Sequence, residues 1–170
     1  MKKSSNKRPI SERNKTRDLW TFLICIFLPF VFGFIGSAFT MDAVKSAWYE
    51  DLKFNLVPPS WIFPVVWNIL FFLIGLALFF SWIDADKKTR IKVGFLFGLN
   101  FILNTFWSIF FFGFKSIGVA LVDLILLWLS ILSIMAFSWN RNRKVTWLLL
   151  PYFLWVSFAG VLNYGFWIRL

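Results

Sequence analysis

The apolar stretch from residue 151 to residue 167, PYFLWVSFAGVLNYGFW, contains side chains that a helix in lipid does not need. Leu, Ile and Val alone would span a membrane, yet this stretch holds two Trp, two Tyr, an Asn and an Ala-Gly pair. Aromatic rings stack on flat molecules, an amide both donates and accepts hydrogen bonds, and small residues leave space. The chemistry these residues offer is noncovalent recognition.

Residues that carry acid–base or metal chemistry are scarce in the rest of the chain. Histidine is absent, and Cys25 is the sole cysteine and lies in an apolar run. The sequence contains no catalytic triad, metal cluster or nucleotide motif, so ordinary acid–base or metal catalysis is not expected. We therefore predict no catalytic residue, no metal site and no cofactor.

The unusual residues gather on one face of each of four apolar runs when these are turned as helices at about 100° per residue. Run by run they are Trp67, Phe71, Ile74 and Leu78; Val93, Phe97, Asn100, Asn104, Trp107 and Phe111; Ser116, Ala120, Asp123, Leu127, Ser130 and Ile134; and Pro151, Tyr152, Trp155, Ala159, Leu162, Asn163 and Phe166. An Asp at mid-helix is disfavoured by about 2.5–3.5 kcal/mol in lipid. We expect these faces to point inward.

Simple packing between helices is the alternative interpretation of these faces. Asn and Ser often join membrane helices by hydrogen bonds, and a lone Asp123 is more typical of a buried tie than of a proton carrier. Several flat rings on inward faces, however, pack poorly without a flat guest, and ligand pockets are typically aromatic with few polar groups. Five other tryptophans are assigned to the membrane interface: Trp20, Trp82, Trp139, Trp147 and Trp167.

The elements that position these residues are five membrane-spanning helices. The composition is 59% hydrophobic and 22% aromatic, with a mean hydropathy of +0.73, which excludes a soluble globular domain. Apolar runs at about 19–40, 61–83, 91–112, 117–139 and 145–168 are each long enough to cross a bilayer, where they must be helical. The predicted fold is an all-α integral membrane protein, with a five-helix transmembrane domain (19–170), a basic tail (1–18) and a first loop (41–60).

The net charge of +10 is explained by membrane topology rather than by nucleic acid. Fourteen Lys and Arg residues lie in the tail and in the second and fourth loops, whereas four lie on the opposite side. The positive-inside rule then places the N-terminus in the cytoplasm and the C-terminus outside. Membrane lipid is an expected partner, with anionic lipid a compatible one for the tail.

A close-packing motif occupies another side of the third helix. Gly94 and Gly98 form a GxxxG pair, which lies about 120–160° from Asn100 at about 100° per residue. Such a strip lets two membrane helices approach closely. It predicts a homodimer through the third helix that leaves the aromatic face free.

Four segments, in order along the chain, resemble the translocator protein family, whose bacterial members are called tryptophan-rich sensory proteins. They are WYEDL at Trp48–Leu52, VPPSWIFPVVWNILFFLIGLALF at Val57–Phe79, LNFILNTFWSIFFF at Leu99–Phe112 and the stretch from Pro151 to Trp167 quoted above. The resemblance covers residues 48–167. It implies a five-helix bundle, often dimeric, in the bacterial plasma membrane, with a pocket that the first loop closes as a lid.

The same resemblance implies a ligand and the residues that bind it. Family members bind porphyrins, particularly protoporphyrin IX. Matching the motif positions gives the ligand-binding residues Tyr49, Trp67, Phe71, Asn100, Asn104, Trp155 and Ala159. Most of these positions also lie on the inward faces, with Trp155 as a pocket wall, Ala159 as the space beside it and Asn163 as a polar tie or anchor.

Three functions are compatible with this site. The leading one is a membrane receptor or sensor for a planar hydrophobic molecule, a porphyrin above all. The second is a carrier that moves such molecules across the bilayer, which paired repeats would favour, and the sequence shows none. The third is light-dependent porphyrin breakdown, a photochemical activity in which Trp residues would take part.

The charge distribution gives the first testable prediction. In a Cys25→Ser background, one cysteine placed in the tail and another placed after Trp167 should react oppositely with an impermeant thiol reagent in intact cells. The tail should be protected and the C-terminus labelled. Equal labelling at both ends would contradict this topology.

Overall fold

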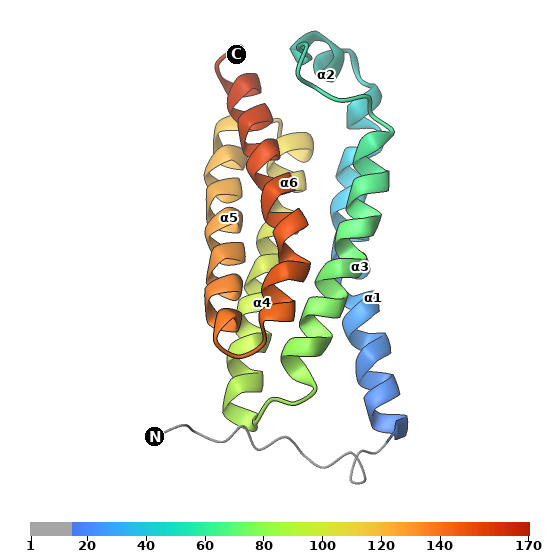
Figure 1. The fold of residues 1–170 in the computed structure, drawn as a ribbon. Helices are drawn as coiled ribbons and strands as arrows, with labels where there is room; N and C mark the ends of the chain where they lie inside the picture. The colour runs from blue at the N-terminus through green and yellow to red at the C-terminus, as the bar shows by residue number, and fades with distance from the viewer. Residues whose placement is uncertain (1–14) are drawn as a thin grey trace.

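The structure, a computed structural model, describes residues 15–170, and these form a bundle of long helices (Figure 1). The long helices are α1 (Lys15–Thr40), α3 (Ile62–Trp82), α4 (Lys87–Ser108), α5 (Ile117–Trp139) and α6 (Arg143–Trp167). Short helices η2 (Ala43–Lys45) and α2 (Ala47–Leu52) form the first loop, and the π-helical turn η3 (Ile109–Gly113) continues α4. Within residues 15–170, five helical segments are long and apolar enough to cross a membrane, which confirms the predicted fold class.

Three of the long helices begin before the expected apolar boundaries, because polar first turns are helical too. α1 starts at Lys15 rather than at residue 19, so part of the expected tail is helical, and residues 1–14 lie outside the described residues. α4 starts after Asp86, whose carboxylate accepts a hydrogen bond of 2.9 Å from the backbone N–H of Thr89. Hydrogen bonding by Thr89, through its side chain first and its backbone N–H second, holds the pKa of Asp86 below its usual range. α6 starts after Asn142, whose side chain accepts from Lys144 N–H. Such caps satisfy backbone groups that hydropathy does not report.

The five long helices close into a ring. α1 packs against α3 and α4, α3 also packs against α6, and α5 packs against both α4 and α6. Gly75 lets α1 approach α3, since a Cβ there would lie 2.8 Å from the Cα of Ile26. The ring encloses one interior that side chains from all five helices can reach.

The predicted inward faces do point into this interior. The exposed fraction is 1% for Asn100, 6% for Ser130 and 1% for Asn163. Pro151 is an exception, because it is exposed on the outer surface between α3 and α6. Pro151 precedes the buried Tyr152, and 100° of rotation is enough to carry it off the inward face.

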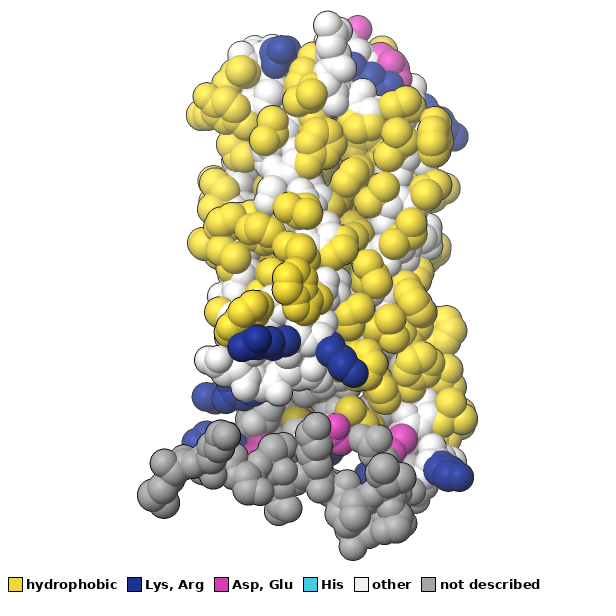
Figure 2. All heavy atoms as spheres, in the orientation of Figure 1, with side chains coloured by type: hydrophobic (Ala, Val, Ile, Leu, Met, Phe, Trp, Pro, Cys, Tyr) yellow, Lys and Arg dark blue, Asp and Glu magenta, His cyan; other side chains and the backbone are white. Residues whose placement is uncertain are grey.

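The two ends of the bundle differ in charge. Figure 2 shows a broad hydrophobic belt with Lys and Arg gathered along its lower border. This basic end holds the start of α1 and the α3–α4 and α5–α6 loops, with nine of the described Lys and Arg residues. The opposite end, which we call the lid end, holds the first loop and the C-terminus (Figure 1). It carries four of the described Lys and Arg residues. Which end faces the cytoplasm stays a prediction.

Candidate functional site

A directional chain of hydrogen bonds crosses the middle of the bundle. Asn104 Nδ2 on α4 donates to the phenol oxygen of Tyr152 on α6 (3.2 Å), and that phenol donates to Asn100 Oδ1 (3.2 Å). Asn100 Nδ2 then donates to Ser130 Oγ on α5 (2.8 Å), which donates to the carbonyl of Leu127 (2.7 Å). The chain joins α4, α5 and α6 and fixes the orientation of both amides.

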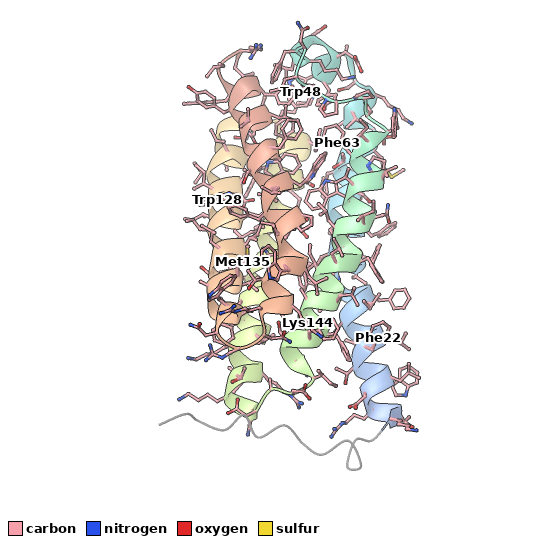
Figure 3. The ribbon with its side chains drawn as sticks, in the orientation of Figure 1. Phe22, Trp48, Phe63, Trp128, Met135 and Lys144 are labelled. Atoms are coloured by element: carbon pink, nitrogen blue, oxygen red, sulfur yellow. The ribbon has the colours of Figure 1, made fainter. Side chains whose placement is uncertain are left out.

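Aromatic rings from α3 and α6 alternate along the seam beside this chain. The ring of Trp67 meets that of Tyr152 edge-on at 6.1 Å between centroids. Toward the lid end, Phe63 meets Trp155 in the same way at 5.9 Å, and Figure 3 shows Phe63 on the side of α3 that faces α6. Edge-to-face pairs of this kind are favourable. The seam is therefore an aromatic wall.

A second set of hydrogen bonds ties the helices near the lid end. Trp107 Nε1 donates to Asn163 Oδ1 (2.9 Å), and Asn163 Nδ2 donates to the carbonyl of Ile117 (3.0 Å). Both polar ends of the buried Asn163 amide are thus used within the protein. Of the two roles expected for Asn163, the structure shows the tie.

The first loop lies over the lid end and contributes Tyr49. Ser46 caps α2 by accepting from the backbone N–H of Tyr49 (3.3 Å). The Tyr49 ring is buried against Phe112 of η3 and Phe166 of α6, with both centroids at 5.8 Å. Beside it, the ammonium group of Lys115 lies 5.3 Å above the ring of Trp48. The first loop is therefore packed down onto η3 and α6, and we call it the lid.

Phe54 holds the far side of the lid in a notch on α6. Its ring sits where a Cβ on Gly165 would come within 2.5 Å of Cζ, and it meets the Phe166 ring edge-on at 5.3 Å. The guanidinium of Arg169 covers it at 4.2 Å. Only glycine at position 165 leaves room for this contact.

Comparison with known proteins shows the family of the chain. The model of the TspO/MBR family matches residues 25–168, most of the chain. The chain belongs to the TspO/MBR family. It is an integral membrane protein of the kind that the predicted resemblance named.

Similar TspO/MBR proteins come from bacteria and animals. The chain is 40% identical over 152 residues to the tryptophan-rich protein TspO of Chlorobaculum tepidum, covering 87% of this chain and 94% of the relative. It is 33% identical over 145 residues to the translocator protein of Bos taurus, covering 82% and 84%. It is 30% identical over 146 residues to the tryptophan-rich sensory protein of Cereibacter sphaeroides, covering 82% and 87%.

The residues carried over from the TspO/MBR family fall into three groups. Trp67, Asn100 and Asn104 meet around Tyr152 in the middle of the bundle. Trp155 and Ala159 lie on α6, one and two turns nearer the lid end. The other two lie to either side: Tyr49 lies within the lid, and Phe71 packs over Gly33 of α1 beside Trp67.

The tie expected at Asp123 is not made. Asp123 on α5 is 5% exposed, and within the described residues its Oδ2 has no hydrogen-bond partner. The inward position of Asp123 was predicted correctly. Its partner could not be predicted, because a short side chain reaches only groups next to it, and a position on a helix face does not say which groups those are. A buried acceptor of this kind is available to a donor from a guest molecule.

Sequence reasoning missed Tyr152 and Phe63 as site residues. Tyr152 carried a signal, because Asn100 and Asn104 are one turn apart, so one phenol on a facing helix can reach both amides. Phe63 precedes Trp67 by four residues and so shares its face. Phe54 carried no signal, because its place depends on a notch that forms only when the lid meets α6.

The lid gives a pH-dependent prediction. Burial, and secondarily the charge of Glu50, raise the pKa of Tyr49 from 10.0 to about 12. The closed lid therefore favours the protonated phenol, so closure is fully retained below pH ~10 and weakens as the pH rises from about 10 through 12. Phenolate absorbance of the wild type minus that of Tyr49→Phe should show a titration near pH 12.

Substitution in the notch tests the same coupling. Gly165→Leu should expel Phe54, open the lid and move the Tyr49 titration toward its ordinary value. Val161→Leu is the matched control, because Val161 is 55% exposed on the same helix and lies outside the notch. A Tyr49 that titrates near pH 10 in the wild type would contradict a closed lid.

Proposed function

We propose that this TspO/MBR protein is a membrane receptor or sensor for a planar hydrophobic molecule of the porphyrin class, protoporphyrin IX above all. The observation that carries the proposal is the convergence of Trp67, Tyr152, Asn100 and Asn104 from three helices inside a lidded bundle. A family of sensory and translocator proteins supports the same assignment.

The side chains of the site suit a flat aromatic ligand. Trp67 and Trp155 bring large apolar rings to the seam between α3 and α6, and flat ligands stack on such rings or meet them at the edge. Asn104 uses Nδ2 within the bundle, which leaves its Oδ1 as an acceptor. The unpaired oxygen of Asp123 is a second acceptor. The pyrrole N–H groups at the centre of a free-base porphyrin are donors that these acceptors would suit.

The same composition predicts that binding depends little on iron. Haem iron takes His, Cys, Met or Tyr as axial ligands. The chain has no His, its one Cys lies on α1 against α3, where Gly75 approaches its carbonyl, and the Tyr152 phenol is already held by Asn100 and Asn104. A haem spectrum with two protein axial ligands would overturn this part of the proposal.

Fluorescence titration tests the site directly. Protoporphyrin IX should quench tryptophan fluorescence saturably, and Trp67→Ala or Trp155→Ala should weaken its binding by about 2 kcal/mol, roughly 30-fold, if these rings are anchors. Ala159→Leu should fill the space beside Trp155 and weaken binding as well. Trp20→Ala is the control, because Trp20 is 61% exposed on α1 at the basic end.

The outcome that would remove the site is equal affinity across the wild type and the three site variants. A loss of equal size in Trp20→Ala would point instead to nonspecific partitioning of porphyrin into the detergent and the protein surface. Helical circular dichroism and melting of each variant distinguish a lost contact from a lost fold.

We also propose that the protein dimerises through the outer face of α4. A Cβ on Gly98 would meet no heavy atom within 4 Å, and one on Gly94 would meet only the Trp82 ring, at an ordinary 3.6 Å. The strip is thus free of intrachain packing. Large apolar side chains flank it, with Phe95 69% exposed and Ile102 44% exposed. Small residues between large ones favour close approach of a second helix.

The dimer is tested by replacing both glycines with leucine. Gly94→Leu/Gly98→Leu should shift the protein to the monomer in light scattering, because side chains would then separate the two backbones. Porphyrin affinity should stay within about twofold of the wild type, since the strip faces away from Asn100. Unchanged mass in detergent would exclude this face as the interface.

A further inference from the structure

A concave surface lies on the outside of the bundle, along the basic-end half of the seam between α3 and α6. It has a volume of about 390 Å³. Its lining is apolar apart from one cation and comprises Leu73, Phe80, Lys144, Trp147, Leu148 and Pro151. Figure 3 shows Lys144 at the lower end of α6 beside α3. We call this surface the seam groove.

The seam groove runs parallel to the helices. α3 and α6 are antiparallel neighbours, and the Lys144 ammonium lies 5.9 Å from the Phe80 ring at the basic end. Leu73 and Pro151 therefore form its inner end. Each wall covers eight residues, and the seven steps between its ends make about 10 Å at 1.5 Å per residue, compared with about 15 Å for one leaflet of a 30 Å hydrocarbon core. A lipid acyl chain lies in this direction and at this depth.

The mouth of the seam groove is positively charged. Lys144 is exposed, and among residues 15–170 no carboxylate lies within ion-pair distance of it. Its neighbours in the loop are also cations, with Arg141 over the ring of Phe137 and Arg143 over that of Trp139. Trp147, 62% exposed, marks the level of the membrane interface. An anion at the mouth would therefore be attracted without competition from a carboxylate among residues 15–170.

We propose that the seam groove binds one anionic phospholipid, with an acyl chain between α3 and α6 and the phosphate beside Lys144. Charge complementarity selects this occupant. The first fourteen residues of the chain carry five Lys and Arg against one Glu, so Lys144 repels them. A soluble anion would leave the apolar walls without a partner. A zwitterionic lipid would bring its own ammonium group close to Arg141, Arg143 and Lys144.

Lipid retention by the full-length protein in detergent tests the proposal. Native mass spectrometry should show that phosphatidylglycerol is retained in preference to phosphatidylcholine with the same acyl chains. Lys144→Gln should weaken phosphatidylglycerol retention about fivefold, the effect of one basic residue near a membrane surface, and should leave phosphatidylcholine unchanged. Lys88→Gln is the matched control: it removes one exposed cation at the same end, from α4 and outside the groove.

A second pair of variants tests the apolar walls. Leu148→Trp should fill the groove and lower retention of both lipids, whereas Leu154→Trp, at a 58% exposed position on the same helix, should not. Thermal melting of each variant checks that the fold is kept. If Leu148→Trp does not fold, the comparison of Lys144→Gln with Lys88→Gln still tests the proposal.

Four results would overturn the proposal. They are equal retention of the two lipids, equal losses in Lys144→Gln and Lys88→Gln, displacement of phosphatidylglycerol by glycerol phosphate alone, and displacement by protoporphyrin IX. The last result would assign the groove to the porphyrin rather than to lipid.

Discussion

Lipid offers no hydrogen-bond partner to a polar side chain, and this constraint decides where the polar groups of the bundle lie. Asn100, Asn104, Ser130 and Tyr152 satisfy one another in a single chain that crosses three helices. Each amide is held by a partner on another helix, so the rotation of α4 relative to α5 and α6 is fixed. The aromatic wall follows from that rotation, because Tyr152 is both the centre of the chain and the ring that Trp67 meets.

The lid depends on the same bundle in a different way. Its contacts are aromatic and cationic rather than amide-based, and they bring together the first loop, η3 and the end of α6. Lys115 adopts a positive φ of 52° where η3 ends, a conformation that non-glycine residues rarely adopt. The turn it makes carries its ammonium to the Trp48 ring. The first loop is thus held on the bundle by aromatic and cation–π contacts at the lid end.

The fold was predictable because it follows from hydropathy, length and the 100° helical period. Those rules gave five spans and placed Asn100, Ser130, Asp123 and Asn163 inside, and the structure agrees. The hydrogen-bond partners of these side chains were less predictable. A helix face gives the direction in which a side chain points but not the level in the bundle at which a partner on another helix lies. The amides of Asn100 and Asn104 were expected to face a ligand, and the structure turns them to Tyr152 first.

Contacts that depend on two distant segments could not be predicted from the sequence. The Phe54 ring fills the space above Gly165, which lies more than a hundred positions later in the chain. Neither residue belongs to a repeating pattern that would indicate this contact. The seam groove likewise requires Pro151, which lies at the edge of the predicted inward face, to turn outward toward α3. Small rotations of a helix determine whether such contacts form, and the amino-acid composition does not determine those rotations.

The central claim is that the Tyr152 phenol orders the site on which a porphyrin binds. Its most direct test compares Tyr152→Phe with Tyr164→Phe, a matched change at a 52% exposed position on the same helix. Tyr152→Phe should lower the stability by about 1 kcal/mol, because it leaves buried amides short of a partner. It should also weaken protoporphyrin IX binding by about tenfold, roughly 1.4 kcal/mol, while Tyr164→Phe changes neither. Equal stability and equal affinity in the two variants would contradict the account.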